Sequence, residues 1–146
     1  MVQRVLKASV TVAGSAGREV VGEIGPGLCV LVGVTHDDTD ATARKLADKI
    51  WGLRVIDDDN GVMNRSVADT TREVLIVSQF TLYGDTSAGR RPSWINAARP
   101  EHAEPLVQAV IDQLRASGAT VASGRFRTEM EVSLINDGPV TVLLEV

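Results

Sequence analysis

The sequence predicts one α/β domain over residues 1–146, in which two amphipathic helices cover one side of a mainly antiparallel sheet system. Two windows place apolar residues at helical spacing, and seven or eight short apolar runs between turn-forming residues are typical of strands. The chain is 44% hydrophobic and 23% charged, as ordinary globular proteins are. A chain of this length can bury a sizeable core, so we expect it to fold without a disulfide or a structural metal.

The first part of the chain predicts three strands and a helix. The strands are expected at 2–12, 20–24 and 28–34, with a turn at 14–17 between the first two. The third run is apolar on both faces, so it should be central and covered on both sides. The helix is expected from about Asp40, with Thr39 as its cap and Gly52 at its end.

The second part predicts a second helix and more strands. A short strand at 53–56 and an apolar strand at 73–79 precede a long irregular segment at 80–98. Loops of that length inside a compact domain are commonly functional. Pro100 should open the second helix, at 101–116. The remaining strand-like runs are at 120–122, 128–135 and 140–145.

The stretch INDGPVT, at 135–141, lies between the last two of these runs. Asp137-Gly138 is a common turn dipeptide, but Pro139 follows where a returning strand should offer a backbone N–H. The pattern therefore allows either a hairpin turn or a rigid segment with another purpose.

Charge and cysteine content narrow the classes of partner and compartment. The net charge of −4 disfavours a general nucleic-acid binder, although arginines gather locally at 90, 91, 99, 125 and 127. The single cysteine, Cys29, lies in an apolar run and is expected to be buried. With no signal-peptide pattern and no apolar run of membrane-spanning length, we expect a cytoplasmic protein without a membrane partner.

The usual catalytic and metal-binding patterns are absent from the sequence. The two histidines, His36 and His102, lack ligand spacing with each other or with the carboxylates, so no metal site is predicted. There is no serine elbow, and the glycine-containing stretches fit no phosphate-loop pattern. Backbone amides, hydroxyl groups and the substrate itself are left as possible sources of catalysis.

The segment SQFTL, at 78–82, ends the apolar strand of the second part. Polar side chains and freed N–H groups emerge together at this strand end, where amides can converge on an oxyanion. The same composition is also common where a strand simply gives way to a loop.

Four motifs resemble the D-aminoacyl-tRNA deacylases of the bacterial and eukaryotic type. They are SQFTLYGD at 78–85, GRRPSW at 89–94, GVMNRSV at 61–67 and NDGPVT at 136–141. The resemblance also covers the opening VQRVLKASVTV, the run GEIGPGLCVLVGVTHDD and the closing strands. It implies a three-layer β/β/α sandwich and an esterase that removes D-amino acids, and glycine mischarged on tRNA-Ala, from the 3′ end of tRNA without a metal or cofactor.

The resemblance also implies how the site is built. Gly138-Pro139 corresponds to a cis-proline motif that enters the partner's active site in a homodimer and holds the substrate's α-amino group, which excludes L-amino acids. Asn136 belongs to the same motif, and Met130 is expected to pack against the site. An X-Pro bond is cis at little cost, so packing can enforce it.

The opposite wall of the implied site is the SQFTL segment, with Ser78, Gln79, Phe80 and Thr81 as the catalytic candidates. Thr81 is either the nucleophile or has little direct catalytic role. In the second case hydrolysis is assisted by the tRNA 2′-hydroxyl, and amides near Phe80 and Thr81 stabilise the oxyanion. The second mechanism is favoured because no base lies beside Thr81 in the sequence.

Binding of tRNA is expected at Arg90, Arg91 and Arg125. The chain departs from the commonest family pattern at Trp94, where phenylalanine is more usual, and at 127–129, where a glycine often follows the phenylalanine. Two alternatives stay open: a related deacylase for L-alanyl-tRNA, and a non-catalytic RNA-binding dimer with the same fold. The intact SQxxL and Gly-Pro motifs favour the D-specific enzyme.

Overall fold

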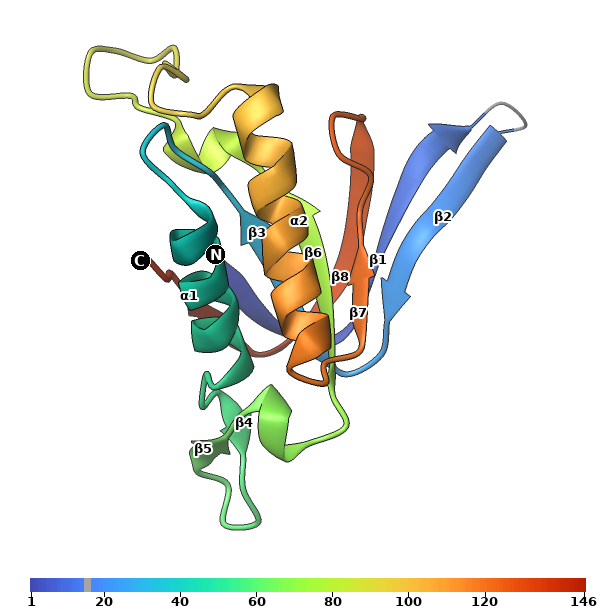
Figure 1. Ribbon diagram of the computed structural model, residues 1–146. Coiled ribbons are helices and arrows are strands. Elements are labelled where there is room, and N and C mark those ends of the chain that lie inside the picture. Colours follow the sequence, from blue (N-terminus) through green and yellow to red (C-terminus); the bar gives the residue numbers. More distant parts are fainter. Residues whose placement is uncertain (15–16) are drawn as a thin grey trace.

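The computed structural model describes residues 1–14 and 17–146, and Figure 1 shows two helices packed side by side over one face of a curled sheet. The sheet has six strands, and a separate two-stranded sheet lies below the helices. The turn expected at 14–17 includes residues 15 and 16, which lie outside the described residues. Neither helix in the described ranges is long and apolar enough to cross a membrane.

The long strand β1 (Val2–Gly14) is the branch point of the sheet. It pairs antiparallel with β2 (Gly17–Ile24), β3 (Gly27–Val32) and β8 (Met130–Val142). The registers show that β3 occupies the first part of β1, from Val2 to Val5, and β2 the later part, from Ala8 to Gly14. Strand β1 therefore joins two arms of the same sheet: one begins with β3, and the other is formed by the later part of β1 with β2.

Most strand pairs are antiparallel, as expected, but parallel pairing occurs in the arm that begins with β3. Strand β6 (Glu73–Ser78) pairs parallel with β3 on one side and with β7 (Val121–Ser123) on the other. Each of these connections passes through a helix, which is how neighbouring parallel strands are joined. The sheet is mixed, and contacts between β2 and β7 bring its arms close to a closed barrel.

Both helices begin and end close to the expected residues. Helix α1 (Asp40–Trp51) begins after Thr39, whose hydroxyl accepts a hydrogen bond from the Thr42 N–H, a cap typically worth about 1 kcal/mol. It ends at Gly52. Helix α2 (Pro100–Ala116) begins at a proline, which needs no hydrogen-bond acceptor in the first turn.

The core has two parts, one on each face of the β3–β6 arm. Leu28 and Ile76 face the helices, whereas Cys29 and Leu75, next to them in sequence, face the side of β1 and β2. Because successive strand residues point to opposite faces, both strands are apolar throughout. The core therefore lies on both faces of the β3–β6 arm, but the six strands form one branched sheet, and the three-layer β/β/α arrangement stays a prediction.

Short elements link these layers. Strands β4 (Ile56–Asp57) and β5 (Met63–Arg65) form the small hairpin. The strand expected at 53–56 is therefore observed only from Ile56, the last residue of that range. The described residues contain two 3₁₀ turns, η1 (Val67–Asp69) and η2 (Phe80–Tyr83), and η2 follows closely on the end of β6.

The hairpin reading of INDGPVT is wrong, because β8 is continuous through it. Pairing with β1 resumes after a bulge: Asn136 is opposite Val5 and Thr141 is opposite Gln3, so β8 has extra residues over this stretch. The Gly138-Pro139 bond is cis, and Gly138 has φ 122°, a conformation that glycine adopts freely. Both residues are exposed, so the bulge projects from the strand.

Candidate active site

A cavity of about 610 Å³ lies at the carboxyl ends of β3 and β6. Four parts of the chain form its walls: these strand ends, the segment 94–98, the first turns of α2 and the loop from β7 to β8. In sheets with parallel strands, ligands commonly bind beyond the carboxyl ends, and this volume suits a small molecule.

The end of β6 supplies the polar wall. Ser78, Gln79 and Phe80 line the cavity, and the Gln79 N–H donates to the Val32 carbonyl at 2.7 Å. The chain then turns into η2, so the backbone leaves the sheet at this point. The Gln79 side-chain amide donates to the Thr81 hydroxyl oxygen. Thr81 therefore lies beside the cavity wall, with its hydroxyl already engaged.

An aromatic pair closes one side of the cavity. The Phe80 ring is 57% exposed and meets Trp94 edge to face, with ring centroids 5.6 Å apart. Trp94 packs directly on Gly84, where the ring leaves no room for a Cβ atom. Backbone hydrogen bonds between Asp85 and Ser93, at 2.8 and 2.9 Å, bring together the two ends of the loop 85–93, next to Trp94. The loop therefore positions Trp94, and Trp94 in turn positions the Phe80 ring.

The opposite wall comes from the β7–β8 loop and the start of β8. Met130 lines the cavity, and its sulfur lies so close to Gly124 that a Cβ there would be 2.6 Å away. Phe126 and Arg127 complete this wall. Arg127 is the one described non-glycine residue with positive φ, at 58°.

No histidine lines the cavity in the described part of the chain. The His36 ring lies 2.8 Å from the Ile95 carbonyl, and the His102 ring 2.9 Å from the Asp38 carbonyl, so both are engaged nearby with backbone. Burial raises the pKa of Cys29 to about 11, and this thiol lies in the core between the sheet arms. The described lining therefore offers backbone amides, the hydroxyls of Ser78 and Thr128, the Arg127 guanidinium and apolar walls, but no His, Lys, Asp or Glu side chain that could act as a base.

No group of three His, Cys, Asp or Glu residues suited to a metal ion is found in residues 1–14 and 17–146. Tyr83 lies in a smaller neighbouring cavity, where burial and the charges of Asp38 and Glu145 raise its pKa. Its phenol is therefore no base for the main cavity at neutral pH.

The Gly138-Pro139 bulge is fixed from behind by Arg4. The Arg4 guanidinium is buried and donates from Nε to the Asp137 carbonyl at 3.2 Å and from Nη1 to the Val55 carbonyl at 2.8 Å. It also pairs with the carboxylates of Asp57 and Asp137, at 3.2 and 3.3 Å. A Cβ on Gly138 would be 2.9 Å from Val140 Cγ2, so the bulge is closely packed on its inner side.

The structure brings some of the predicted residues together and leaves others apart. Ser78, Gln79, Phe80 and Met130 share the cavity, and Thr81 adjoins it. Asn136, Gly138 and Pro139 are not among its described lining residues. They follow Met130 along β8 by six to nine residues, which is roughly 20–30 Å at about 3.3 Å per strand residue.

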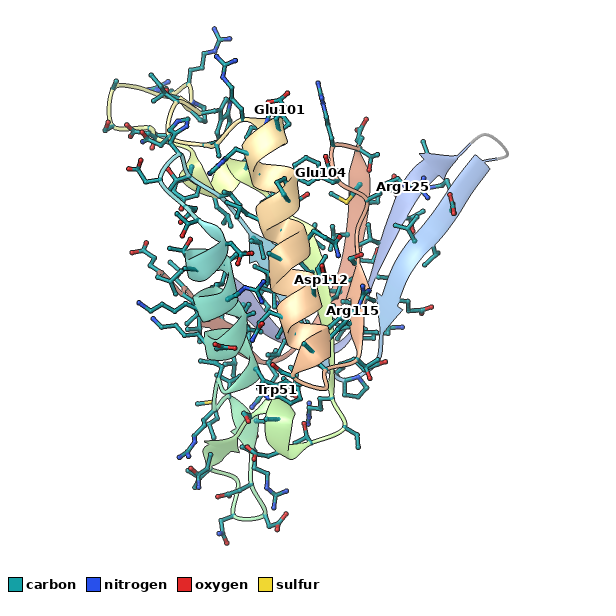
Figure 2. All side chains as sticks on the ribbon, in the orientation of Figure 1. Trp51, Glu101, Glu104, Asp112, Arg115 and Arg125 are labelled. Carbon is teal, nitrogen blue, oxygen red and sulfur yellow. The ribbon has the colours of Figure 1, made fainter. Side chains whose placement is uncertain are left out.

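The predicted arginines differ in their surroundings. Arg90 and Arg91 are exposed on the loop between Gly84 and Pro100, which lies at the top in Figure 1. Arg125 turns toward β2 (Figure 2) and pairs with Glu19 at 3.2 Å, and it is not among the described residues that line the cavity. Its partner carboxylate makes Arg125 a weaker candidate for a phosphate contact than an arginine without one.

Sequence reasoning did not select Arg4, Gly84 or Arg127 as site residues, and it noted Arg127 only as one of the clustered arginines and as a departure from the family pattern. Arg4 is a charged residue in an apolar strand, a signal of a buried partner, but nothing local identified the partner 133 positions away. The glycine more usual at position 127 was a signal that the backbone there has a positive φ.

A family model described as D-Tyr-tRNA(Tyr) deacylase matches residues 1–145 of the chain. A D-aminoacyl-tRNA deacylase from Symbiobacterium thermophilum is 56% identical over 145 residues, covering 99% of this chain and 93% of that protein. A D-aminoacyl-tRNA deacylase from Nocardia farcinica is 59% identical over 148 residues, covering 99% of this chain and 97% of that protein. The likeness thus extends far beyond the motifs around the cavity.

Solved structures share the fold. One titled c-Myc DNA Unwinding Element Binding Protein superposes with a TM-score of 0.91 at 40% identity, covering 99% of this chain and 96% of that one. Another, titled as a probable eukaryotic D-amino acid tRNA deacylase, gives a TM-score of 0.79 at 16% identity, covering 94% and 93%. At that identity the second structure supports the fold alone.

Proposed function

The chain belongs to the D-Tyr-tRNA(Tyr) deacylase family and is a hydrolase that acts on D-aminoacyl-tRNA, and from that premise we propose that it selects D-amino acids through a motif shared between two subunits. In this proposal the chain is a homodimer, and Gly138-Pro139 of each subunit closes the cavity of the other. The substrates are D-aminoacyl-tRNA and glycine mischarged on tRNA-Ala. The product is free amino acid and tRNA.

The observation that carries this proposal is the separation of the Gly138-Pro139 bulge from its own cavity. Cavity and bulge lie at opposite ends of β8, and both residues of the motif are exposed. Arg4 and Asp137 hold the bulge from behind, so it is a fixed projection, and its residues are not among the described lining of the cavity in its own chain. A second copy related by twofold symmetry would receive it and offer its own in return.

Such a projection would discriminate by shape. Its backbone carbonyls would accept hydrogen bonds from the substrate's α-amino group and thereby fix the α-carbon. An L side chain would then point into the rigid motif, whereas a D side chain or the hydrogen of glycine would not. Asn136 would help to hold this half of the site, and Met130 would support the opposite wall.

Hydrolysis would rely on stabilising the oxyanion. Water adds to the ester carbonyl carbon, the bond to the ribose oxygen breaks, and the tRNA leaves with its hydroxyl restored. Backbone amides near Phe80 and Thr81 would stabilise the negative oxygen at the end of β6, beside Ser78. Because the Thr81 hydroxyl accepts a hydrogen bond from Gln79 and has no base beside it, we assign proton transfer to the substrate's 2′-hydroxyl.

Contacts with the tRNA body are assigned to exposed arginines. Arg90 and Arg91 lie on the loop beside the cavity and make none of the ion pairs formed by the described residues. Arg125, expected to act with them, would have to leave Glu19 first. Action on aminoacyl-tRNA fits the cytoplasmic location expected from the sequence, which stays a prediction.

Two other functions are tested by the same experiment. One is removal of L-alanine from mischarged tRNA. The other is nucleic-acid binding without hydrolysis; the 40% identical structure is titled as a protein that binds a DNA unwinding element. The protein is incubated with D-tyrosyl-tRNA, L-tyrosyl-tRNA, L-alanyl-tRNA and glycyl-tRNA-Ala. We expect loss of the D-tyrosyl and glycyl esters alone. Hydrolysis of the L-esters, or binding without any hydrolysis, would refute the chirality filter.

A further inference from the structure

We infer that Arg127 binds the 5′-phosphate of the terminal nucleotide of the substrate, the phosphate nearest to the scissile ester. This inference rests on the proposed function, because it assumes that the cavity at the end of β6 receives the aminoacylated end of the tRNA. It concerns a residue that is not part of the SQFTL or Gly-Pro motifs.

The size of the cavity places the phosphate at its mouth. A volume of about 610 Å³ is of the order that holds one aminoacylated nucleoside, so the next group along the chain must lie outside. That group is the 5′-phosphate. Arg127 lines the cavity and is itself exposed, so it stands at the boundary between cavity and solvent.

The backbone of Arg127 supports a role for its side chain. Its φ of 58° is left-handed, a conformation in which glycine costs less than any residue with a Cβ. An unfavourable conformation kept at the edge of a site points to a requirement for the residue there. The loop holds this shape through a hydrogen bond from the Thr128 hydroxyl to the Arg125 carbonyl at 2.8 Å.

The charge of Arg127 is available for a ligand. Six of the other eleven arginines form ion pairs with described residues, among them Arg125, two residues earlier, which pairs with Glu19. Arg127 makes none of the ion pairs among residues 1–14 and 17–146. A guanidinium matches two phosphate oxygens at once, which makes arginine well suited to this contact.

Negative charge lies close to the mouth of the cavity. The chain carries a net charge of −4, and two carboxylates, Glu101 and Glu104, lie on the first turns of α2 next to the cavity (Figure 2). Pro100 and Ala103 of the same turns line the cavity, and Glu129 follows Arg127 in the loop. A phosphate brought to this mouth therefore meets negative charge that Arg127 would offset.

The experiment compares two ligands that differ only in this phosphate. They are 3′-deoxy-3′-(D-tyrosylamino)adenosine, whose amide resists hydrolysis, and its 5′-monophosphate. Their Kd values are measured by calorimetry at low and high salt. In the unaltered protein the phosphate should tighten binding about fivefold at low salt, the range of an exposed charge-assisted contact, and less at high salt.

Four variants separate the charge from the backbone. Arg127→Asn and Arg127→Gly tolerate the left-handed backbone and should abolish the preference for the phosphate, whereas Arg127→Lys should keep part of it. Arg54→Asn removes one positive charge near the β4–β5 hairpin, at the far end of the molecule, and should leave the preference intact. With D-tyrosyl-tRNA as substrate, Arg127→Asn should raise KM and leave kcat unchanged.

An unchanged preference for the phosphate in Arg127→Asn would overturn the inference, as would the absence of any preference in the unaltered protein. These outcomes are distinct from failure of the proposed function. If the protein bound both analogues but did not hydrolyse D-tyrosyl-tRNA, the proposed function would fail while the phosphate contact was still measured. If Arg54→Asn lost the preference equally, the effect would come from overall charge and the assignment to Arg127 would be wrong.

Discussion

Replacing Arg4 by methionine should disturb both the stability of the fold and the Gly138-Pro139 bulge. Methionine keeps an unbranched apolar side chain of similar reach in the buried strand β1 but removes the guanidinium. The Val55 carbonyl and the Asp137 carbonyl then lose their donor, and the carboxylates of Asp57 and Asp137 lose a cation.

The expected loss follows from these contacts. A buried pair broken on one side typically costs about 3–5 kcal/mol, and the lower end applies here because both carboxylates partly reach water. For a chain of this size, a loss of about 3 kcal/mol corresponds to a drop in Tm of roughly 6–12 °C. Asp57→Asn, which removes only the half-exposed partner, should cost under about 1 kcal/mol.

The assay combines thermal unfolding with deacylation of D-tyrosyl-tRNA and L-tyrosyl-tRNA at a temperature where the variant is folded. We expect Arg4→Met to reduce the discrimination between the two esters, because the bulge is no longer fixed from behind. An Arg4→Met protein with unchanged Tm and unchanged discrimination would show that Arg4 does not hold the motif.

Three further changes test the cavity wall, the aromatic pair and the core thiol. Thr81→Ala should keep deacylation within about tenfold of the unaltered rate, as expected for one lost hydrogen bond, and complete loss in a folded protein would identify a nucleophile. Gly84→Ala should destabilise the fold by about 1–3 kcal/mol in denaturant titrations because its Cβ meets the Trp94 ring, while Gly52→Ala, which has room for a Cβ, should be close to neutral. Since burial raises the pKa of Cys29 from 9.0 to about 11, the unfolded chain loses this proton first, and the free energy of unfolding should fall between pH 9 and 11. A Cys29→Ala protein with an equally steep fall would contradict that assignment.

The sequence predicted what depends on neighbouring residues. Thr39 and Gly52 marked the ends of α1 because caps act within one turn. The strand 28–34 was recognised as central because both of its faces are apolar, and it became β3, buried between the two halves of the core. The strand end at Ser78 to Phe80 was open to two readings, and only the family resemblance made these residues catalytic candidates; they do line the cavity.

What the sequence did not predict depends on residues far apart in the chain. Parallel pairing of β3 with β6 is decided by the crossover through α1, which a list of strand-like runs does not contain. INDGPVT looked like a turn because its local chemistry is that of a turn, yet pairing with β1 on both sides keeps β8 continuous. The donor that fixes this bulge, Arg4, is at the opposite end of the sequence.

The proposal that each site is completed by the other subunit is tested most directly by a mixed dimer. One subunit carries Ala103→Trp, which fills the cavity, and the other carries Gly138→Ala with Pro139→Ala, which alters the projection. The two chains are co-expressed with different tags and purified together. Each variant alone should be inactive on D-tyrosyl-tRNA.

The mixed dimer contains one site with an open cavity and an intact motif from its partner, so it should recover about half of the unaltered activity per dimer. Had the motif served the cavity of its own chain, the mixed dimer would contain no complete site. An inactive mixed dimer, or the failure of two differently tagged chains to associate, would contradict the shared site.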